Sequence, residues 1–188
     1  MLVNVARTLA RSAVNGPGER YVLWAQGCPL ACPSCWNPDT WSFKKRVPRK
    51  SADLADEILA TSGIEGATFT GGEPFAQAAA LAEIAATIKD GGLSLFIFTG
   101  YTLEELSSPD HQRLLAHADI LVSGRYVDSL RSNALPWRGS TNQEVHFLSG
   151  RYGPDSIPDT SSLEFHLNPD VAPSITGFPI EDEWRTLL

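Results

Sequence analysis

The 188-residue sequence predicts an α/β fold built around a parallel sheet. Short apolar runs alternate with segments of helical periodicity through the middle of the chain, which is the pattern of consecutive βαβ crossovers. The hydrophobic fraction of 43% and the charged fraction of 20% are ordinary for a globular domain. Because a chain of this length is most simply one domain with a sizeable core, we expect one main domain.

The first predicted elements are two strands and two helices. Residues 21–25 (YVLWA) form an apolar run that predicts a buried strand. Residues 52–62 carry apolar side chains at helical spacing, and Ser51 is a candidate N-cap for this helix. Residues 66–70 (GATFT) predict a short strand that enters the motif GGEP. The alanine-rich segment 76–88 then predicts a helix that ends at an Asp-Gly-Gly turn.

The alternation continues through the second half of the domain. Residues 93–98 (LSLFIF) predict a buried strand, which is followed by TGYT and a short helix around residues 103–106. A further short helix is expected at residues 111–118. Residues 119–122 (DILV) and 145–148 (VHFL) predict two more strands.

Four polar loops follow predicted strands: the cysteine-rich loop, GGEP, TGYT and SGRY. In parallel sheets the chemistry lies at the carboxyl ends of the strands, in the loops that follow them. We therefore expect the four loops to gather at one edge of the sheet and to form one site.

The regular pattern stops at Gly150. Five prolines interrupt the last 38 residues, which contain one strand-like run at residues 163–167 (LEFHL). The sequence therefore predicts a domain over residues 1–149 and an extension over residues 150–188, either a hairpin laid on the domain or an ordered lid.

All three cysteines lie within eight residues, as Cys28, Cys32 and Cys35. An odd number of thiols cannot be fully paired as disulfides, and this tight cluster favours metal ligation over free buried cysteines. A structural zinc site needs four closed ligands, which a distant histidine would have to complete. An iron–sulfur cube fits thiolates better, and three of them leave one iron open to an outside ligand.

The formal net charge of −7 is unevenly distributed, because residues 44–50 (KKRVPRK) carry five positive charges. This run is either a solvated loop or a docking face for an oppositely charged protein. Nucleic-acid binding is disfavoured, since the chain is acidic overall and the basic run has no interleaved aromatic residues.

No membrane or export signal is evident. No apolar stretch approaches the roughly 18 residues of a membrane span, and the N-terminal sequence MLVNVARTLARS lacks the apolar core of a signal peptide. We expect a cytoplasmic protein without a membrane partner, and a reducing compartment also suits an oxygen-sensitive cluster.

The spacing Cys28-x3-Cys32-x2-Cys35, followed after a helix by GGEP, resembles the radical S-adenosylmethionine (SAM) superfamily. The resemblance implies that the three cysteines hold a [4Fe–4S] cluster whose open iron binds the amino and carboxylate groups of SAM. A GGEP motif alone is a weak signal, because Gly-Gly turns before an acidic residue are common.

Longer segments of the sequence resemble one family within this superfamily. NGPGER (residues 15–20), CPSCWNPDTW, FTGYTLEEL and ILVSGRYVDSLRSNALPWRGSTNQ (residues 120–143) are similar to the activating component of class III anaerobic ribonucleoside-triphosphate reductase. That family implies a shortened, incomplete (β/α) TIM-like barrel for residues 1–149. It also implies an oxidoreductase that cleaves SAM reductively and takes a hydrogen atom from a glycine of a large partner enzyme, with an electron donor such as flavodoxin.

The resemblance assigns roles to the strand-end residues. Gly71, Gly72 and Glu73 would line the methionyl end of SAM, since glycine lets a backbone come close to a ligand. Thr99, at the end of the next strand, would meet the ribose or methionyl groups.

Three further residues are candidates for the same site. Arg138 is a candidate partner for the SAM carboxylate, which a guanidinium matches bidentately. Asn142 would make a polar contact. Trp36, directly after the third cysteine, would either shield the cluster from water, which is the favoured role, or contact SAM directly.

The chain also departs from this family. The family usually has an aspartate at the position of Ser123, and the extension after Gly150 exceeds its compact version. Two alternatives therefore stay open: a radical SAM maturase of another peptide or protein, and a non-catalytic iron–sulfur or zinc module.

Overall fold

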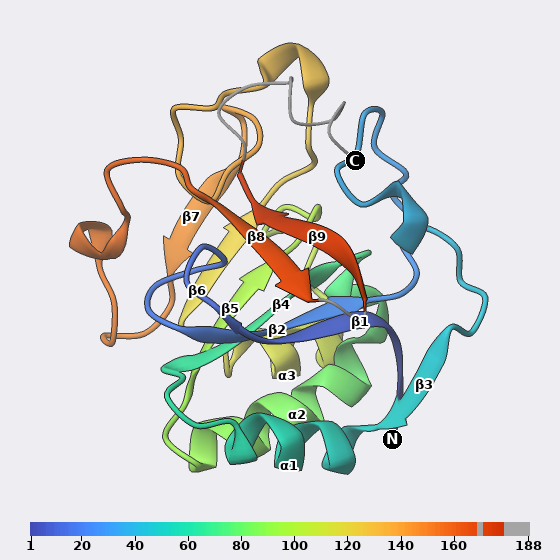
Figure 1. Cartoon of the computed structure of the whole chain (residues 1–188). Coiled ribbons are helices and arrows are strands. Elements are labelled where there is room, and N and C mark those ends of the chain that lie inside the picture. Colours follow the sequence, from blue (N-terminus) through green and yellow to red (C-terminus); the bar gives the residue numbers. More distant parts are fainter. Residues whose placement is uncertain (169–170, 179–188) are drawn as a thin grey trace.

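In a computed structural model of the chain, the structure describes residues 1–168 and 171–178. One seven-stranded sheet has the order β3-β1-β2-β4-β5-β6-β7 (Figure 1). Its strands are β1 (Leu2–Ser12), β2 (Arg20–Ala25), β3 (Val47–Lys50), β4 (Gly66–Gly71), β5 (Ser94–Phe98), β6 (Ile120–Ser123) and β7 (Glu144–Phe147).

The central strands β2, β4, β5 and β6 are parallel, as the alternating pattern predicts. The pairs β1–β2, β1–β3 and β6–β7 are antiparallel, so the sheet is mixed rather than wholly parallel. These antiparallel strands interrupt the βαβ progression on both sides, and the sheet stays open with β3 and β7 as its edges. The mixed α/β class is thus confirmed, whereas the described residues do not close a TIM-like barrel.

Three helices, α1 (Ser51–Ala60), α2 (Ala78–Asp90) and α3 (Pro109–Leu115), cover one face of the sheet. Short 3-10 helices occupy several connections: Pro38–Thr40, Pro74–Gln77, Asp128–Leu130 and Pro154–Ser156. A separate hairpin of β8 (Leu163–Asn168) and β9 (Val171–Gly177) lies on the other side of the sheet (Figure 1). None of the helices among the described residues is long and apolar enough to cross a bilayer.

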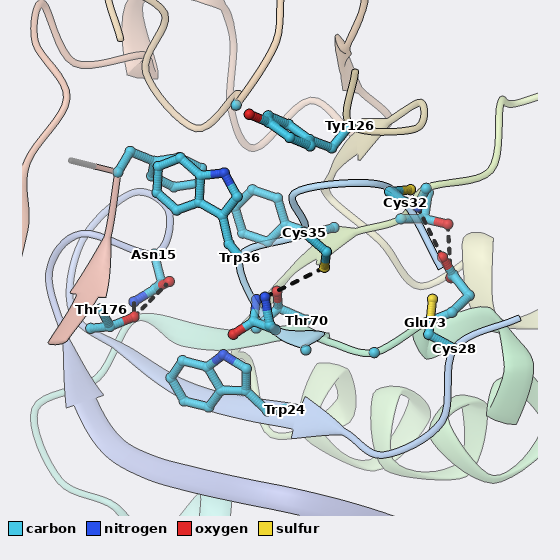
Figure 2. Close-up of a pocket in the computed structure, with 18 of the residues that line it drawn as sticks. Asn15, Trp24, Cys28, Cys32, Cys35, Trp36, Thr70, Glu73, Tyr126 and Thr176 are labelled. Atoms are coloured by element: carbon cyan, nitrogen blue, oxygen red, sulfur yellow. Dashed lines mark hydrogen bonds between the residues drawn. The ribbon is translucent and has the colours of Figure 1, made fainter. Parts of the chain in front are cut away.

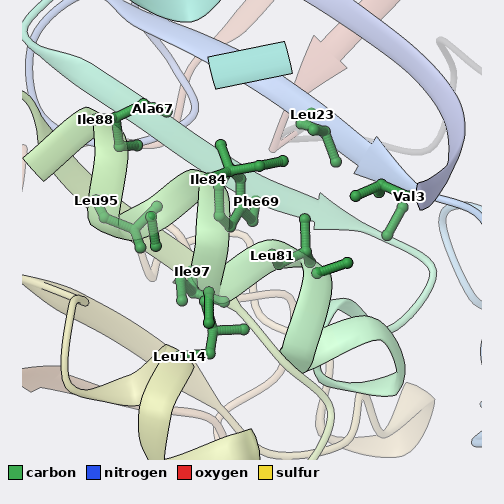
Figure 3. Packing of buried hydrophobic residues seen from close by; sticks show 14 of the residues in the cluster. Val3, Leu23, Ala67, Phe69, Leu81, Ile84, Ile88, Leu95, Ile97 and Leu114 are labelled. Carbon is green, nitrogen blue, oxygen red and sulfur yellow. The ribbon is translucent and has the colours of Figure 1, made fainter. Parts of the chain in front are cut away.

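The main core lies between the sheet and α2 (Figure 3). Helix α2 turns Leu81, Ile84 and Ile88 toward the sheet at helical spacing, and all three are fully buried. Strand β4 presents Ala67 and Phe69 to the helices at alternate positions. Thr68 and Thr70 of β4 face the opposite side of the sheet.

A smaller apolar cluster covers the opposite face of the sheet. There Phe96 of β5 packs edge-on against Trp137, with ring centroids 5.2 Å apart, and Ile120 and Val122 of β6 complete the cluster. The segment that contains WRGSTNQ therefore lies against the face that the helices leave uncovered.

Two details of the sequence prediction are wrong. Residues 103–106 form a turn rather than a helix, although Leu106 is buried. Ser51 is the first residue of α1, whose N-cap is Lys50. The hydroxyl of Ser51 instead bonds to Glu83 and accepts a hydrogen bond from the N-terminal ammonium of Met1 (2.7 Å), so it ties α1 to α2 and the chain start.

Arg20 is a fully buried arginine at the start of β2. Its guanidinium donates to Thr68 Oγ1 of β4 (2.8 Å), to Ser94 Oγ of β5 (3.0 Å), and to the carbonyl oxygens of Pro17, Ala67 and Ser94. Burial lowers the pKa of this guanidinium. Because a buried charge is tolerated only when its donors are satisfied, these bonds hold the amino ends of three parallel strands in register.

We predict that Arg20→Leu lowers the free energy of unfolding by about 3 kcal/mol or more, because several buried acceptors lose their donor. Arg11→Leu is the control, since Arg11 forms only an exposed pair with Glu19 at 3.5 Å and should cost less than about 0.5 kcal/mol. Urea unfolding of both variants under reducing conditions measures the difference. Equal effects of the two substitutions would contradict this role of Arg20.

Candidate functional site

A cavity of about 430 Å³ lies at the carboxyl ends of the parallel strands (Figure 2). Residues from all four predicted loops line it, and residues of β9 form part of its wall. The expectation that these loops meet at one edge of the sheet is therefore confirmed.

The cysteine loop is held in place by backbone bonds to the segment that follows it. The amide of Gly27 donates to Thr40 O (2.8 Å), and that of Cys28 donates to Trp41 O (3.0 Å). Within the loop Cys35 N donates to Cys32 O (3.2 Å). Bonds of this kind fix the loop from both sides, so the three thiols keep a defined arrangement.

Cys28, Cys32 and Cys35 are free thiols of intermediate exposure, and all three line the cavity (Figure 2). Burial raises the pKa of the Cys28 and Cys32 thiols. Among the described residues, no three His, Cys, Asp or Glu side chains are close enough together to hold a single metal ion. A zinc ion needs its thiolates to meet within about 2.3 Å of one point, whereas a four-iron cube takes each thiolate on a separate iron.

Gly71 and Gly72 let β4 end in close contact with β2. Gly71 has φ +96°, and a Cβ atom there would lie 2.7 Å from Trp24 Cα. A Cβ on Gly72 would lie 2.4 Å from Gly27 O. The close approach that these glycines permit is thus to the neighbouring strand and the base of the cysteine loop.

Glu73 is buried and joins two strand ends. Its carboxylate accepts hydrogen bonds from Phe75 N (2.9 Å), Thr99 Oγ1 (2.8 Å) and Gly100 N (2.9 Å), while Glu73 N donates to Gly27 O (2.9 Å). Burial raises the pKa of this carboxyl to about 7, against the lowering effect of the three donors. Glu73 therefore connects the GGEP turn, the cysteine loop and the loop after β5.

The predicted site residues do not all line the cavity. Cys28, Cys32, Cys35, Trp36, Gly71, Gly72, Glu73 and Thr99 do so. Arg138 and Asn142 are not among the lining residues. The Nε atom of Arg138 is buried without a hydrogen-bond partner among the described residues, and Asn142 is exposed and donates to Arg125 O (2.8 Å).

The motif WRGSTNQ reaches the cavity through Gly139 and through its last residue, Gln143. Gln143 Oε1 accepts from Gly139 N (2.7 Å), and Gln143 Nε2 donates to Gly124 O (3.0 Å). All three residues line the cavity. Gln143 therefore fastens this motif to the SGRY loop, a role that its position in the sequence did not reveal.

Ser123 is buried at the end of β6, and its hydroxyl lies 2.8 Å from His146 Nε2 of β7. Its polar group thus pairs with the neighbouring antiparallel strand. Ser123, where the resemblance predicts an aspartate, therefore has a local partner in this chain.

Sequence reasoning missed the residues at the end of the cavity away from Cys28 (Figure 2). Arg7 of β1 lies over the Trp24 ring, 4.4 Å from its centroid. Asn15 Nδ2 donates to Thr176 Oγ1 of β9 (3.0 Å). Phe178, just after β9, packs against Trp36 with ring centroids 6.1 Å apart. The hairpin therefore closes this end, and only recognition of β1 and β9 as strands would have revealed it.

Comparison with known proteins gives a consistent result. A family model described as a 4Fe-4S single cluster domain matches residues 14–146. The chain is 34% identical to the anaerobic ribonucleoside-triphosphate reductase-activating protein of Escherichia coli K12 over 146 residues, which cover 72% of this chain and 92% of that protein. The protein of the same name from Vibrio cholerae is 34% identical over 142 residues, covering 71% and 90%. That of Enterobacteria phage T4 is 30% identical over 150 residues, covering 76% and 93%.

The match to the cluster domain spans the cysteine loop, GGEP and the loops after β5 and β6, which together form most of the cavity wall. The relatives align over almost their whole length. The chain therefore belongs to the family of anaerobic ribonucleoside-triphosphate reductase-activating proteins and contains the 4Fe-4S single cluster domain.

Proposed function

We propose that this protein is a radical SAM enzyme that installs a glycyl radical on a large partner, an anaerobic ribonucleoside-triphosphate reductase. Cys28, Cys32 and Cys35 would hold a [4Fe–4S] cluster. When bound, that cluster would supply one electron, received from an outside donor, for the cleavage of SAM, and the 5′-deoxyadenosyl radical so formed would take a hydrogen atom from the partner's glycine.

The donor set is the observation that carries this proposal. Three thiols line one wall of a single cavity, and no fourth cysteine exists in the sequence. Three thiolates leave one iron of a cube without a protein thiolate, and an open coordination position is what distinguishes catalytic from structural metal sites. Because all three thiols line the cavity, a group that they hold would border it.

The cavity wall supports a role in binding SAM. Gly71, Gly72 and Glu73 bring backbone groups to the end of the cavity that the cysteines line. We propose that these three residues contact the methionyl group of SAM. The hydroxyl of Thr99 already donates to Glu73 and accepts from Tyr101 N (3.1 Å), so we expect Thr99 to act mainly by positioning Glu73. Asn142 is a weaker proposal because its amide already bonds to Arg125 O.

Two arginines are candidates to bind an anionic group of a substrate. The Nε atom of Arg138 is buried without a hydrogen-bond partner among the described residues, but Arg138 does not line the cavity. Arg7 already lines the cavity, stacked on Trp24. We therefore retain Arg138 as a proposed carboxylate partner and add Arg7 as a contact at the far end of the cavity.

The aromatic residues of the cavity would exclude water. Trp36 packs against Phe178, which also contacts Phe98 with ring centroids 5.8 Å apart. A dry surround tunes the potential of an iron–sulfur cluster and protects reactive intermediates. We propose a flavodoxin-like donor, a reducing cytoplasmic setting, and no nucleic-acid or membrane partner.

One observation favours a second candidate function. The hairpin β8–β9 lies outside the matched residues 14–146, yet Ile175 and Thr176 line the cavity. A cavity wall formed by this hairpin would suit a target other than the reductase. The protein would then be a radical SAM maturase of another protein. An EPR signal of a glycyl radical, formed on a co-incubated anaerobic reductase from the same organism, decides for the activase. SAM cleavage without that signal favours the maturase.

We predict that anaerobically reconstituted protein forms 5′-deoxyadenosine when dithionite and SAM are added. Cys28→Ala, Cys32→Ala and Cys35→Ala should each lower that rate about 100-fold or more, because each removes a cluster ligand. The control is Ser34→Gly in the same loop, where φ is +58° and glycine is tolerated. One zinc per chain and no 5′-deoxyadenosine would refute the enzymatic proposal.

The raised pKa of Glu73 predicts a specific pH dependence of the unfolding free energy. Its folded pKa of about 7 lies above the ordinary value of 4.5, so the folded protein holds a proton that the unfolded chain releases as pH rises. The contribution of Glu73 to stability is therefore greatest below pH 4.5 and is lost by about pH 7. From pH 4.5 to 7.5, the unfolding free energy of Glu73→Gln should gain up to about 3 kcal/mol relative to the unsubstituted protein.

Urea unfolding of the metal-free proteins across this range measures the change. A difference between the two proteins that stays constant with pH would show that Glu73 titrates normally.

A further inference from the structure

An exposed basic surface adjoins the cysteine loop. It consists of Phe43, Lys44, Lys45, Arg46, Val47, Pro48, Arg49 and Lys50, which we call the basic segment (residues 43–50). All of these residues except Arg49 are exposed, and none of them lines the cavity. The basic segment is therefore available to a partner that does not enter the cavity.

Most of its positive charge is not neutralised. Arg46 pairs with Asp39 at 3.4 Å, and Arg49 pairs with Glu57 at 2.6 Å. Lys44, Lys45 and Lys50 form no ion pair with any residue that the structure describes. Three of the five cations of the basic segment thus have no ion-pair partner among the described residues, on a chain whose net charge is −7.

The basic segment also exposes apolar surface. The side chain of Phe43 is 61% exposed and that of Val47 is 48% exposed. An apolar centre with a charged rim is the usual composition of a transient protein interface. Exposed aromatic residues commonly serve as anchors at such interfaces.

The basic segment is firmly attached to the base of the cysteine loop. A Cβ atom on Gly27 would lie 2.7 Å from the Phe43 ring, so that ring packs directly against the residue before Cys28. Gln26 Nε2 donates to Ser42 O (2.7 Å), and the side chain of Asn4 bonds to Lys44 O (3.1 Å) and Arg46 N (2.8 Å). A protein seated here would therefore lie beside the base of the cysteine loop, outside the cavity wall.

We propose that the basic segment is the docking surface of an acidic protein that donates electrons to the cluster. This inference rests on the proposed function, which requires one electron from outside for each SAM cleaved. The donor is oxidised by one electron and the cluster is reduced by one, and no atom is transferred at this surface. Because the rest of the chain is acidic, the basic segment would orient an acidic donor with its redox group toward the thiols.

The test variant is Lys44→Glu/Lys45→Glu in the full chain, reconstituted anaerobically. Both lysines are exposed and unpaired, so the substitutions should not affect folding. Arg11→Glu/Arg113→Glu is the control, because it changes the net charge equally at exposed positions on β1 and α3. Reduction of the cluster is followed by stopped-flow absorbance with two reductants, dithionite at high ionic strength and a reduced flavodoxin of negative net charge.

We expect flavodoxin at low ionic strength to reduce the lysine variant at least about tenfold more slowly than the unsubstituted protein, with a weaker dependence on salt. The arginine control should change by less than about twofold. Dithionite should reduce all three proteins equally, and their iron contents should match.

An unchanged flavodoxin rate together with normal dithionite reduction would overturn the docking proposal and leave the proposed function intact. The lysine variant could instead be reduced normally by flavodoxin but fail to activate the reductase. That result would show that the basic segment binds the reductase, and it would also overturn the docking proposal. If dithionite reduces no cluster in the unsubstituted protein, the proposed function fails and the inference fails with it.

Discussion

The buried carboxylate of Glu73 is the contact on which the candidate site depends. It accepts hydrogen bonds from the hydroxyl of Thr99 and from the backbone amides of Phe75 and Gly100. These bonds fix the loop after β5 to the turn after β4. The backbone amide of Glu73 bonds to Gly27 O at the base of the cysteine loop. One residue therefore sets the relative positions of three strand ends. A buried carboxylate is costly, and these donors offset part of that cost, although burial still raises the pKa of Glu73 to about 7.

Arg20 has the corresponding role at the opposite ends of the same strands. It joins β2 to Thr68 of β4 and Ser94 of β5. The parallel core is thus held by a buried cation at its amino ends and a buried carboxyl at its carboxyl ends. Between these two groups the sheet packs on α2 through apolar residues, so the loops at the site are mounted on a rigid support.

The sequence predicted the central part of this arrangement. Apolar runs identified β2, β4, β5 and β6 to within a residue or two, and parallel pairing then required their loops to meet. Strands β1 and β3 gave weaker signals. β1 and β3 carry arginine, lysine and polar residues among their apolar ones, so neither shows the continuous apolar run of a buried strand. The segment around Leu103 is too short to form a helix, although the spacing of Leu103 and the buried Leu106 suggested one.

The site was predictable where chemistry depends on local spacing and less so where it depends on distant contacts. The cysteines and GGEP were recognised from adjacent residues. Arg7, Gln143 and the β9 wall were not, because each reaches the cavity only through tertiary packing. Arg138 illustrates the reverse case, since its motif is distinctive yet its side chain lies outside the cavity wall.

The central claim is that three thiolates hold a four-iron cluster with one position left for SAM. Mössbauer spectroscopy of protein reconstituted with ⁵⁷Fe, recorded with and without SAM, tests it most directly. We expect about one quarter of the iron signal to shift when SAM binds, because only the iron without a thiolate changes its ligands. A spectrum in which SAM changes no iron, or in which all irons are equivalent throughout, would contradict it.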